Sequence, residues 1–432
     1  MNGIVPTLKE HWKRLHHIPK GIWLLLISYS LVVFGSPMPS KITWLEIVAG
    51  AGLLMAGAML AWPVIEQARQ HRPAKWCLIL TALLFSVPSC IGFLRGNGLP
   101  DMLRDIFPLA FLTLFPILMT YSVPSDKRAA IQPLVVAVLV FVGICSAAMF
   151  VVGVNHLYGS LNKLAMLIRG GLEQVGATQA TQATQAQVFL KLYDPSVLFT
   201  AIFLGAWGVV LMVRSWRGWL PGLFMLSLSV LIAYEFTILG LRAYAALFVL
   251  AIATIFLTQL RNRGLYIRLL PVLFVACVLL SSQIEAVLQL LWAKQQLVGS
   301  NGKLNEWLDV ISTVFSSFQT ALFGIGWGGV LVNSIYSNAP TRFTHSILSF
   351  YLLKTGTIGL GVLLTVIGML FARLQKVGVS GTFDIPRLIL LVSCIPPLLI
   401  GVLFETTYKM LSYGVILALF ALALPKFEKK TR

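Results

Sequence analysis

The sequence predicts an all-α, polytopic membrane protein with about 12 transmembrane helices, and three observations lead to this fold class. Apolar side chains make up 58% of the 432 residues and charged side chains only 11%, whereas a soluble domain needs about 25% charged residues to cover its surface. The mean hydropathy is +0.86. The apolar residues also fall into runs of about 17 to 25 residues, the length of a membrane-spanning helix. We therefore expect a single integral membrane domain over residues 1–432.

The predicted spans follow one another along the whole chain. Because the bilayer core holds no water for the backbone, each apolar run is expected to be a helix. Twelve runs qualify: 21–36, 42–65, 76–94, 105–122, 130–153, 195–213, 218–236, 239–260, 267–283, 344–372, 385–404 and 407–425. All five cysteines fall inside these runs, so we expect small apolar core residues rather than disulfides.

The net charge of +18 is explained by the orientation of these spans. An even number of spans places both termini on one side of the membrane. That side collects 21 of the 33 Lys and Arg but only five of the 15 Asp and Glu. By the positive-inside rule it is cytoplasmic. The basic excess is therefore attributed to membrane topology, and no nucleic-acid partner is expected.

Two long loops are predicted on the opposite, outer side, at 154–194 and 284–343. The first contains an Ala-Thr-Gln repeat at 177–185, to which we assign no chemistry. The second contains two amphipathic stretches, 284–297 and 304–318. The latter places six apolar residues on one helical face, which we expect to meet the membrane interface or the helix bundle: Leu304, Trp307, Leu308, Ile311, Val314 and Phe315.

The candidate catalytic residue is His345, which lies where the second outer loop returns to the membrane. An imidazole titrates near neutral pH and can act as a general base. The alternative is an interfacial histidine that is bonded to a neighbouring carbonyl.

A glycine-rich run, Gly324-Ile-Gly-Trp-Gly-Gly329, precedes this histidine. Its glycines predict tight turns and a close approach of the backbone to a ligand; the loop-shaping residues are Gly324, Gly326 and Gly328. Three later residues predict a half-helix that is broken before the true span begins: Lys354, Gly356 and Gly359.

Basic residues on the outer side are the candidates for binding an anion. Arg242 lies near the outer end of an apolar span, where a guanidinium requires a partner or a polar cavity. It is expected either to bind a phosphate or diphosphate or to pair with Glu235 of the preceding span. Lys191 precedes Asp194-Pro195, which predicts a helix start, and an anion there would also meet a helix amino end.

Three further outer cations are candidate substrate-binding residues, although each alone is more often a solvated loop charge: Arg169, Lys303 and Arg342. No His, Cys, Asp or Glu residues have the spacing of metal ligands. We therefore expect no metal and no cofactor.

The order of these motifs resembles the O-antigen ligase and polymerase superfamily of bacterial envelopes, over roughly residues 190–372. The family's basic residue before an N-P-N turn corresponds to Lys191, and the turn to Asp194-Pro195-Ser196. Its Ser-Arg pair appears as Leu241-Arg242, and its loop arginine before tryptophan as Lys303, with Trp307 in place. Its histidine appears as His345 in a Thr-His-Ser setting, and the acidic residue that often follows is replaced by Lys354.

The resemblance implies a fold similar to GT-C membrane glycosyltransferases and an inner-membrane location with a periplasmic active site. It also implies a glycan donor on undecaprenyl diphosphate and, for a ligase, a lipid A core sugar as acceptor. Arg242 and Lys191 would then hold the diphosphate. His345 would take the proton of the attacking hydroxyl, with inversion at the anomeric carbon and without metal.

Three alternatives to a ligase remain open from the sequence. An O-antigen polymerase and a protein O-oligosaccharyltransferase share these motifs. A lipid-linked oligosaccharide flippase, or another transporter, is the alternative that is not an enzyme. Ligase is favoured because the outer loops are moderate and no C-terminal soluble domain is evident. Transport is disfavoured because we find no repeat between the two halves and no charge deep in an uninterrupted span.

Overall fold

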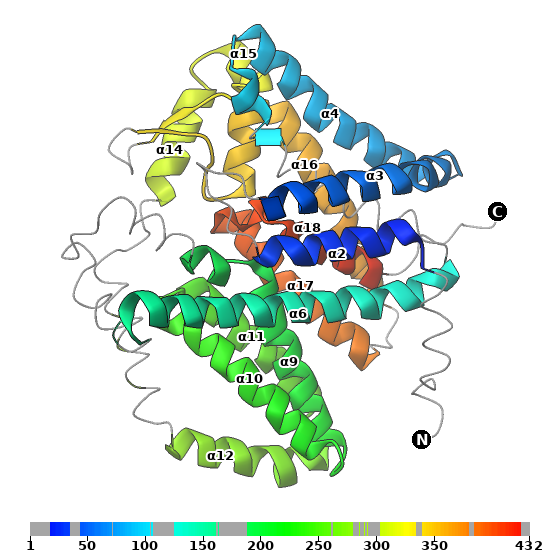
Figure 1. Ribbon diagram of the computed structural model, residues 1–432, viewed down its shortest axis with the longest axis vertical. Helices are drawn as coiled ribbons and strands as arrows, with labels where there is room; N and C mark the ends of the chain where they lie inside the picture. Colours follow the sequence, from blue (N-terminus) through cyan, green and yellow to red (C-terminus); the bar gives the residue numbers. More distant parts are fainter. Residues whose placement is uncertain are drawn as a thin grey trace.

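The computed structural model describes residues 18–34, 44–70, 72–103, 105–106, 125–160, 163, 188–260, 262–279, 285, 289, 292, 303–333, 339–379 and 384–424. Within these ranges the protein is a bundle of helices, and its only sheet is a small antiparallel hairpin (Figure 1). The hairpin consists of β1 (Leu331–Asn333) and β2 (Ala339–Thr341). The helices are α2 (Lys20–Phe34), α3 (Trp44–Gln70), α4 (Arg72–Leu94), α6 (Ser125–Tyr158), α9 (Pro195–Arg214), α10 (Trp219–Ile238), α11 (Arg242–Thr258), η2 (Leu265–Leu269), α12 (Leu270–Leu279), α14 (Lys303–Val314), α15 (Phe318–Phe323), α16 (Ile347–Val379), α17 (Ile385–Leu403), η4 (Thr406–Lys409) and α18 (Leu411–Ala423).

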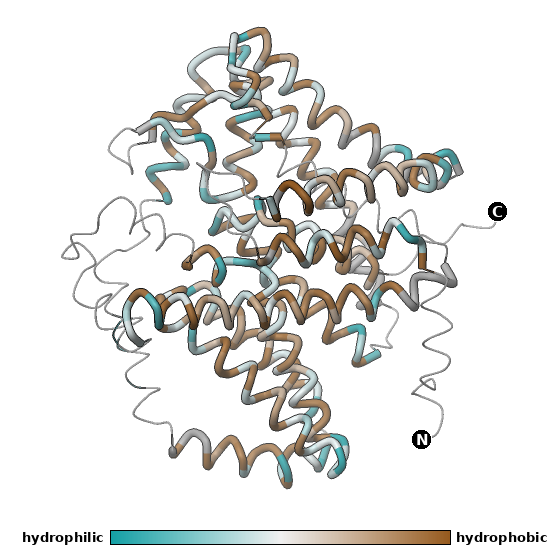
Figure 2. Tube along the Cα trace, in the orientation of Figure 1, coloured by the Kyte–Doolittle hydropathy of each residue, from teal (hydrophilic) through white to brown (hydrophobic). Residues whose placement is uncertain are grey.

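The membrane class of the fold is confirmed. Six helices are long and apolar enough to cross a bilayer, namely α3, α6, α9, α10, α16 and α17. Five other predicted spans coincide with shorter apolar helices, in α2, α4, α11, η2 with α12, and α18. The run predicted at 105–122 lies almost wholly outside the described residues. Figure 2 shows hydrophobic residues along the lengths of the helices, with hydrophilic residues gathered at their ends and connections.

α9 is the central helix of the bundle. In the most apolar 18 residues of α9, 83% of the residues are buried, whereas the corresponding share in the other five long helices is 33–50%. Small residues let α10 lie directly against it, because a Cβ on Gly208 would come within 2.7 Å of the Gly222 carbonyl oxygen. The Ser229 hydroxyl of α10 donates to the Ala201 carbonyl of α9 at 2.6 Å. The largest group of buried hydrophobic residues joins α2, α3, α6, α16, α17 and α18.

The predicted break in the helix after His345 is confirmed. Inside α16, Gly356 has φ 64° and ψ −164°, so residues 347–355 form a separate half-helix. The break opens the carbonyls of Leu353 and Lys354, and these accept backbone N–H groups of the glycine-rich run at 2.9 and 3.1 Å. The half-helix is therefore joined to the loop that precedes it.

The two outer loops differ in part from the prediction. The first begins later than residue 154, because α6 continues to Tyr158. The repeat at 177–185, the candidate Arg169 and most of the stretch 284–297 lie outside the described residues.

The helix predicted within 304–318 is present as α14, but its buried face is not the predicted one. Its buried residues are Glu306, Val310 and Val314. Four of the six residues predicted to share an apolar face are exposed: Leu304, Leu308, Ile311 and Phe315. The prediction that this face packs on the helix bundle is therefore wrong for four of its six residues.

Candidate active site

His345 is held by a buried carboxylate from α14. Its Nδ1 lies 2.8 Å from Oε2 of Glu306, and its backbone N–H donates to Oε1 of the same residue at 2.7 Å. Glu306 is 1% exposed, whereas 23% of the His345 side chain is exposed. Since an ionised carboxylate only accepts hydrogen bonds, Nδ1 carries the proton in this contact. The basic nitrogen of the neutral ring is then Nε2.

Local hydrogen bonds fix the segment that carries His345. Ser346 precedes the first residue of α16, and its hydroxyl accepts the backbone N–H of Ser349 at 3.1 Å, as in an N-cap. The Ser349 hydroxyl donates to Oγ1 of Thr344 at 2.7 Å. The two neighbours of the histidine in its Thr-His-Ser setting are therefore buried parts of a helix start.

The turn between α17 and α18 packs against this segment. The hydroxyl of Tyr408 donates to the Thr344 carbonyl at 2.9 Å. The Nζ atom of Lys409 lies 4.0 Å from the ring centroid of Phe343, and that ring stacks on Phe350 of α16 at 5.4 Å. Residues about 65 positions apart in the sequence thus contact the segment that carries His345. The sequence places Lys409 inside the predicted span 407–425, and no local pattern indicates its contact with Phe343.

The glycine-rich run makes the predicted turns: φ is 72° at Gly324, 77° at Gly326 and 82° at Gly328. Its close approach, however, is to helices rather than to a ligand. A Cβ on Gly326 would lie 2.4 Å from the backbone nitrogen of Gly92 in α4. The side-chain amide of Asn97 holds the Trp327 carbonyl at 2.8 Å. The expected ligand-binding loop is therefore a buried structural element.

Lys354 also bonds to the glycine-rich run. Its ammonium is 0% exposed and donates to Asp105 Oδ2 at 2.6 Å and to the Gly329 carbonyl. The same carboxylate oxygen accepts the Gly328 backbone N–H at 2.7 Å. This buried pair holds the end of the glycine-rich run in place.

Two of the predicted substrate-binding cations are already paired. Lys303 lies 2.9 Å from Glu405 Oε1 and also donates to the Phe404 carbonyl at 2.7 Å. Arg342 lies 2.6 Å from Asp101 Oδ1. Substrate binding by either residue would require competition with these carboxylates. We therefore assign both a structural role first.

The structure brings together the segments that carry Lys191 and Arg242. Tyr193, two residues after Lys191, packs edge-on against Tyr244, two residues after Arg242, with ring centroids 6.3 Å apart. The predicted helix start is confirmed, because Asp194 caps α9 by accepting the Ser196 N–H at 2.9 Å. The anion expected at this helix end stays a prediction, and it would have to share the site with the Asp194 carboxylate.

The alternative role of Arg242, an ion pair with Glu235, is not formed in the described part of the chain. Glu235 is 6% exposed, and its Oε2 atom has no hydrogen-bond partner there. Arg242 itself is half-buried at the first position of α11. Anion binding by Arg242 stays a prediction.

Glu405 interacts both with the helix that carries Glu306 and with the segment that carries Lys191. It forms the ion pair with Lys303, the first residue of the helix that carries Glu306. Burial, and after it the Glu405 carboxylate, raise the pKa of the Tyr193 phenol. The negative charge of Glu405 therefore reaches the segment that contains Lys191.

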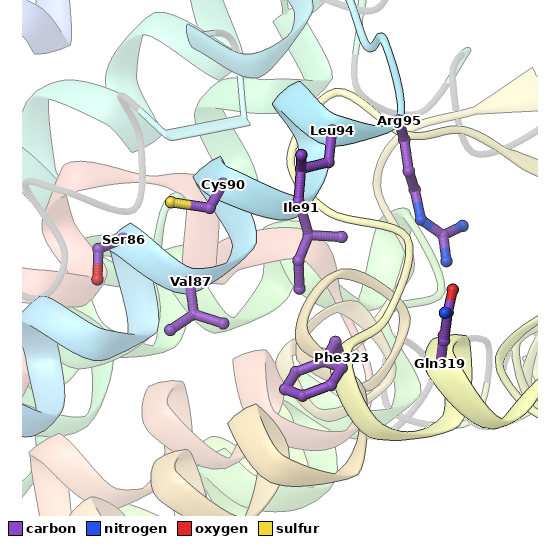
Figure 3. A pocket seen from close by; sticks show the side chains of 8 residues that line it. All are labelled: Ser86, Val87, Cys90, Ile91, Leu94, Arg95, Gln319 and Phe323. Carbon is purple, nitrogen blue, oxygen red and sulfur yellow. The ribbon is translucent and has the colours of Figure 1, made fainter.

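A separate cavity of about 540 Å³ opens between α4 and α15 (Figure 3). Apolar side chains from α4 and Phe323 line most of it, and the side chains of Arg95 and Gln319 point toward each other at one end. None of the candidate site residues lines this cavity. The candidate active site is therefore assigned to the surroundings of His345.

Within the described residues, no three His, Cys, Asp or Glu side chains are grouped so that they could hold a metal ion. The candidate site therefore consists of a histidine oriented by a carboxylate, with cations on neighbouring segments. Comparisons of this chain with protein-family models, with curated proteins and with solved structures found no match.

Proposed function

We propose that this protein is an O-antigen ligase of the bacterial inner membrane. It would transfer a glycan from undecaprenyl diphosphate to a hydroxyl of a lipid A core sugar at the periplasmic face, in lipopolysaccharide biosynthesis. The proposal includes about 12 spans in a GT-C-like bundle, with both termini in the cytoplasm. It is supported by the family resemblance over residues 190–372 and by the geometry around His345.

The observation that carries the proposal is the contact between His345 and Glu306. A general base requires a defined tautomer and a fixed ring orientation, and a buried carboxylate on Nδ1 provides both. His345 donates two hydrogen bonds to this one buried carboxylate, one from its backbone N–H and one from Nδ1. The partly exposed ring is also accessible to a substrate.

The proposed reaction is a single displacement. Nε2 of His345 takes the proton of the acceptor hydroxyl while its oxygen forms a bond to the anomeric carbon of the donor glycan. The bond from that carbon to the diphosphate oxygen breaks, and undecaprenyl diphosphate leaves with the electron pair. Arg242 and Lys191 would neutralise the charge that develops on the leaving group. The configuration at the anomeric carbon is inverted, and no nucleotide or metal ion takes part.

The test is reconstitution of the full-length protein in liposomes with an undecaprenyl-diphosphate-linked glycan and lipid A core, followed by mass analysis of the product. The His345→Ala variant is expected to lose transfer by about 10²–10⁴-fold. The matched control is His156→Ala, since His156 is the other outer histidine and is exposed at the end of α6. Retention of activity in His345→Ala would remove this residue from the mechanism.

The same assay separates the alternatives. Extension of one lipid-linked glycan by another would identify a polymerase, and glycosylation of a protein acceptor would identify an O-oligosaccharyltransferase. Movement of the intact donor across the membrane without a new glycosidic bond would identify a flippase. Transfer in the presence of a chelator and without nucleotide is expected. A strict requirement for Mg²⁺ would contradict the proposed mechanism.

A further inference from the structure

We propose that Lys409 is an anion-binding residue of the active site and that its ammonium contacts the diphosphate of the polyprenyl-linked donor beside His345. This inference rests on the proposed function for the identity of the anion. Lys409 belongs to none of the motifs that carry the family resemblance. The case for it comes from its position, from the absence of an ion pair to it among the described residues and from the chemistry of the proposed step.

The position of Lys409 is fixed by its neighbours in η4. The Tyr408 hydroxyl bonds the carbonyl of Thr344, the residue immediately before His345. The Lys409 ammonium lies over the ring of Phe343, at 4.0 Å from its centroid. Two adjacent residues of η4 therefore contact the two residues that precede the candidate base.

Lys409 differs from three other cations of this region in its ion pairing. Lys303, Arg342 and Lys354 each lie within 3 Å of a carboxylate oxygen. Lys409 is half-buried and has no ion-pair partner in the described part of the chain. The face of an aromatic ring compensates such a cation only in part. An anionic ligand would complete its environment.

Burial lowers the pKa of Lys409 to about 8, and the carboxylates of Asp105 and Glu306 raise it in part. His345 is the other titratable group on the segment that Lys409 covers. Of the helices that contact η4, α18 has no charged residue and α17 has only Arg387, near its opposite end. The first half of α16, which contacts Tyr408 through Phe350, carries Lys354, and this lysine is paired with Asp105. Lys409 therefore has most of its charge at neutral pH and loses it as the pH rises through about 8.

The proposed displacement needs a cation at this place. When the bond between the anomeric carbon and the diphosphate breaks, negative charge grows on the leaving oxygen. A fixed ammonium near the base stabilises that charge without accepting or losing a proton. Lys409 is thus assigned to the phosphate next to the sugar, which brings it close to the reacting carbon.

The test measures binding to the purified full-length protein in detergent, with farnesyl diphosphate as the probe. We expect Lys409→Met to weaken binding by about tenfold or more, because one ion contact is lost. Lys409→Arg should bind within about threefold of the wild type, because the charge is retained. The matched control is Lys75→Met, an exposed lysine in the first turn of α4. Melting temperatures show that each variant is folded.

A pH series adds a second readout. The ratio of farnesyl diphosphate affinities, Lys409→Arg over wild type, should rise between pH 7 and pH 9, because only the lysine loses its charge in that window. Equal affinity of a folded Lys409→Met variant, or a ratio that does not change with pH, would overturn the inference.

A second arm distinguishes a donor site from a lipid headgroup site. Nanodiscs with and without phosphatidylglycerol are compared for competition with the probe. If phosphatidylglycerol competes with the probe, and if this competition depends on Lys409 as strongly as probe binding does, the site belongs to a membrane lipid. That result would overturn the inference. If Lys409-dependent binding is found but the wild type transfers no glycan, the anion site stands and the proposed function fails.

Discussion

Two acid–base pairs flank the first half of α16, and they differ in burial rather than in geometry. His345 lies 2.8 Å from Glu306, and Lys354 lies 2.6 Å from Asp105. In the second pair both side chains are 0% exposed, and the lysine and the carboxylate also bond the backbone of the glycine-rich run. In the first pair the acid is buried, but 23% of the histidine side chain is exposed.

This difference separates a structural pair from the pair that we propose to be reactive. A buried ammonium with two acceptors holds two chain segments together and has no access to a substrate. A histidine that is bonded on one nitrogen and partly open to its surroundings is oriented and still accessible. The comparison predicts that changes at Lys354 act on stability, whereas changes at Glu306 act on catalysis.

The largest expected effect is on the buried pair. Lys354→Met leaves the Asp105 carboxylate buried without its cation, which should destabilise the protein by about 3–5 kcal/mol. The double variant with Asp105→Asn should recover much of this loss, because no isolated charge remains. Thermal unfolding in detergent measures both. If Lys354→Met melted like the wild type and lost only transfer activity, the two pairs would have been assigned the wrong way round.

The next effect is on the pair that orients the base. Glu306→Gln replaces one acceptor oxygen by an amide group that donates, so one of the two hydrogen bonds from His345 is lost or the ring changes tautomer. We expect glycan transfer to fall by about 10²-fold, or about 2.7 kcal/mol in the barrier, with little change in melting temperature. Asp309→Asn on the same helix is the control. Equal losses in both variants would indicate a general disturbance of α14.

How much of this could be predicted from the sequence depends on the range of the interaction. Apolar runs, the Asp194-Pro195 helix start, the positive φ angles of the glycine-rich run and the break at Gly356 are all set by local sequence, and the structure confirms them. The pairing of His345 with Glu306 joins residues 39 positions apart. That of Lys354 with Asp105 joins residues 249 positions apart. No local pattern specifies which acid meets which base.

The buried face of α14 shows a second limit of sequence analysis. In a soluble protein the apolar face of an amphipathic helix turns inward, because water surrounds the molecule. Beside a membrane, lipid also accepts apolar side chains. The side chains of Leu304 and Leu308 are therefore exposed, while Glu306 turns inward to His345. The available signal was weak, because Glu306 and Asp309 both lie on this helix and the sequence does not show which of them turns inward.

A smaller effect is expected in the loop that Lys354 anchors. Gly326→Ala adds a Cβ at φ 77° and only 2.4 Å from the backbone of Gly92, and we expect a loss of about 1–3 kcal/mol in stability. The control is Gly361→Ala in α16, where a Cβ meets nothing within 4 Å. If Gly326→Ala kept its melting temperature but lost donor binding, the glycine-rich run would be a ligand loop after all.

The smallest effect should come from a third pair, which is the most exposed of the three. Lys303 and Glu405 are each 24% exposed in their side chains, and ion pairs that reach solvent contribute about 0–1 kcal/mol. Lys303→Met should therefore change the melting temperature little. If Lys303 only ties α14 to the turn before η4, transfer should also fall by less than about threefold, and Glu405→Gln should have the same effect. A much larger loss of transfer in Lys303→Met than in Glu405→Gln would show that Lys303 exchanges its carboxylate for the substrate. Exposure would then predict reactivity in this site better than pairing does.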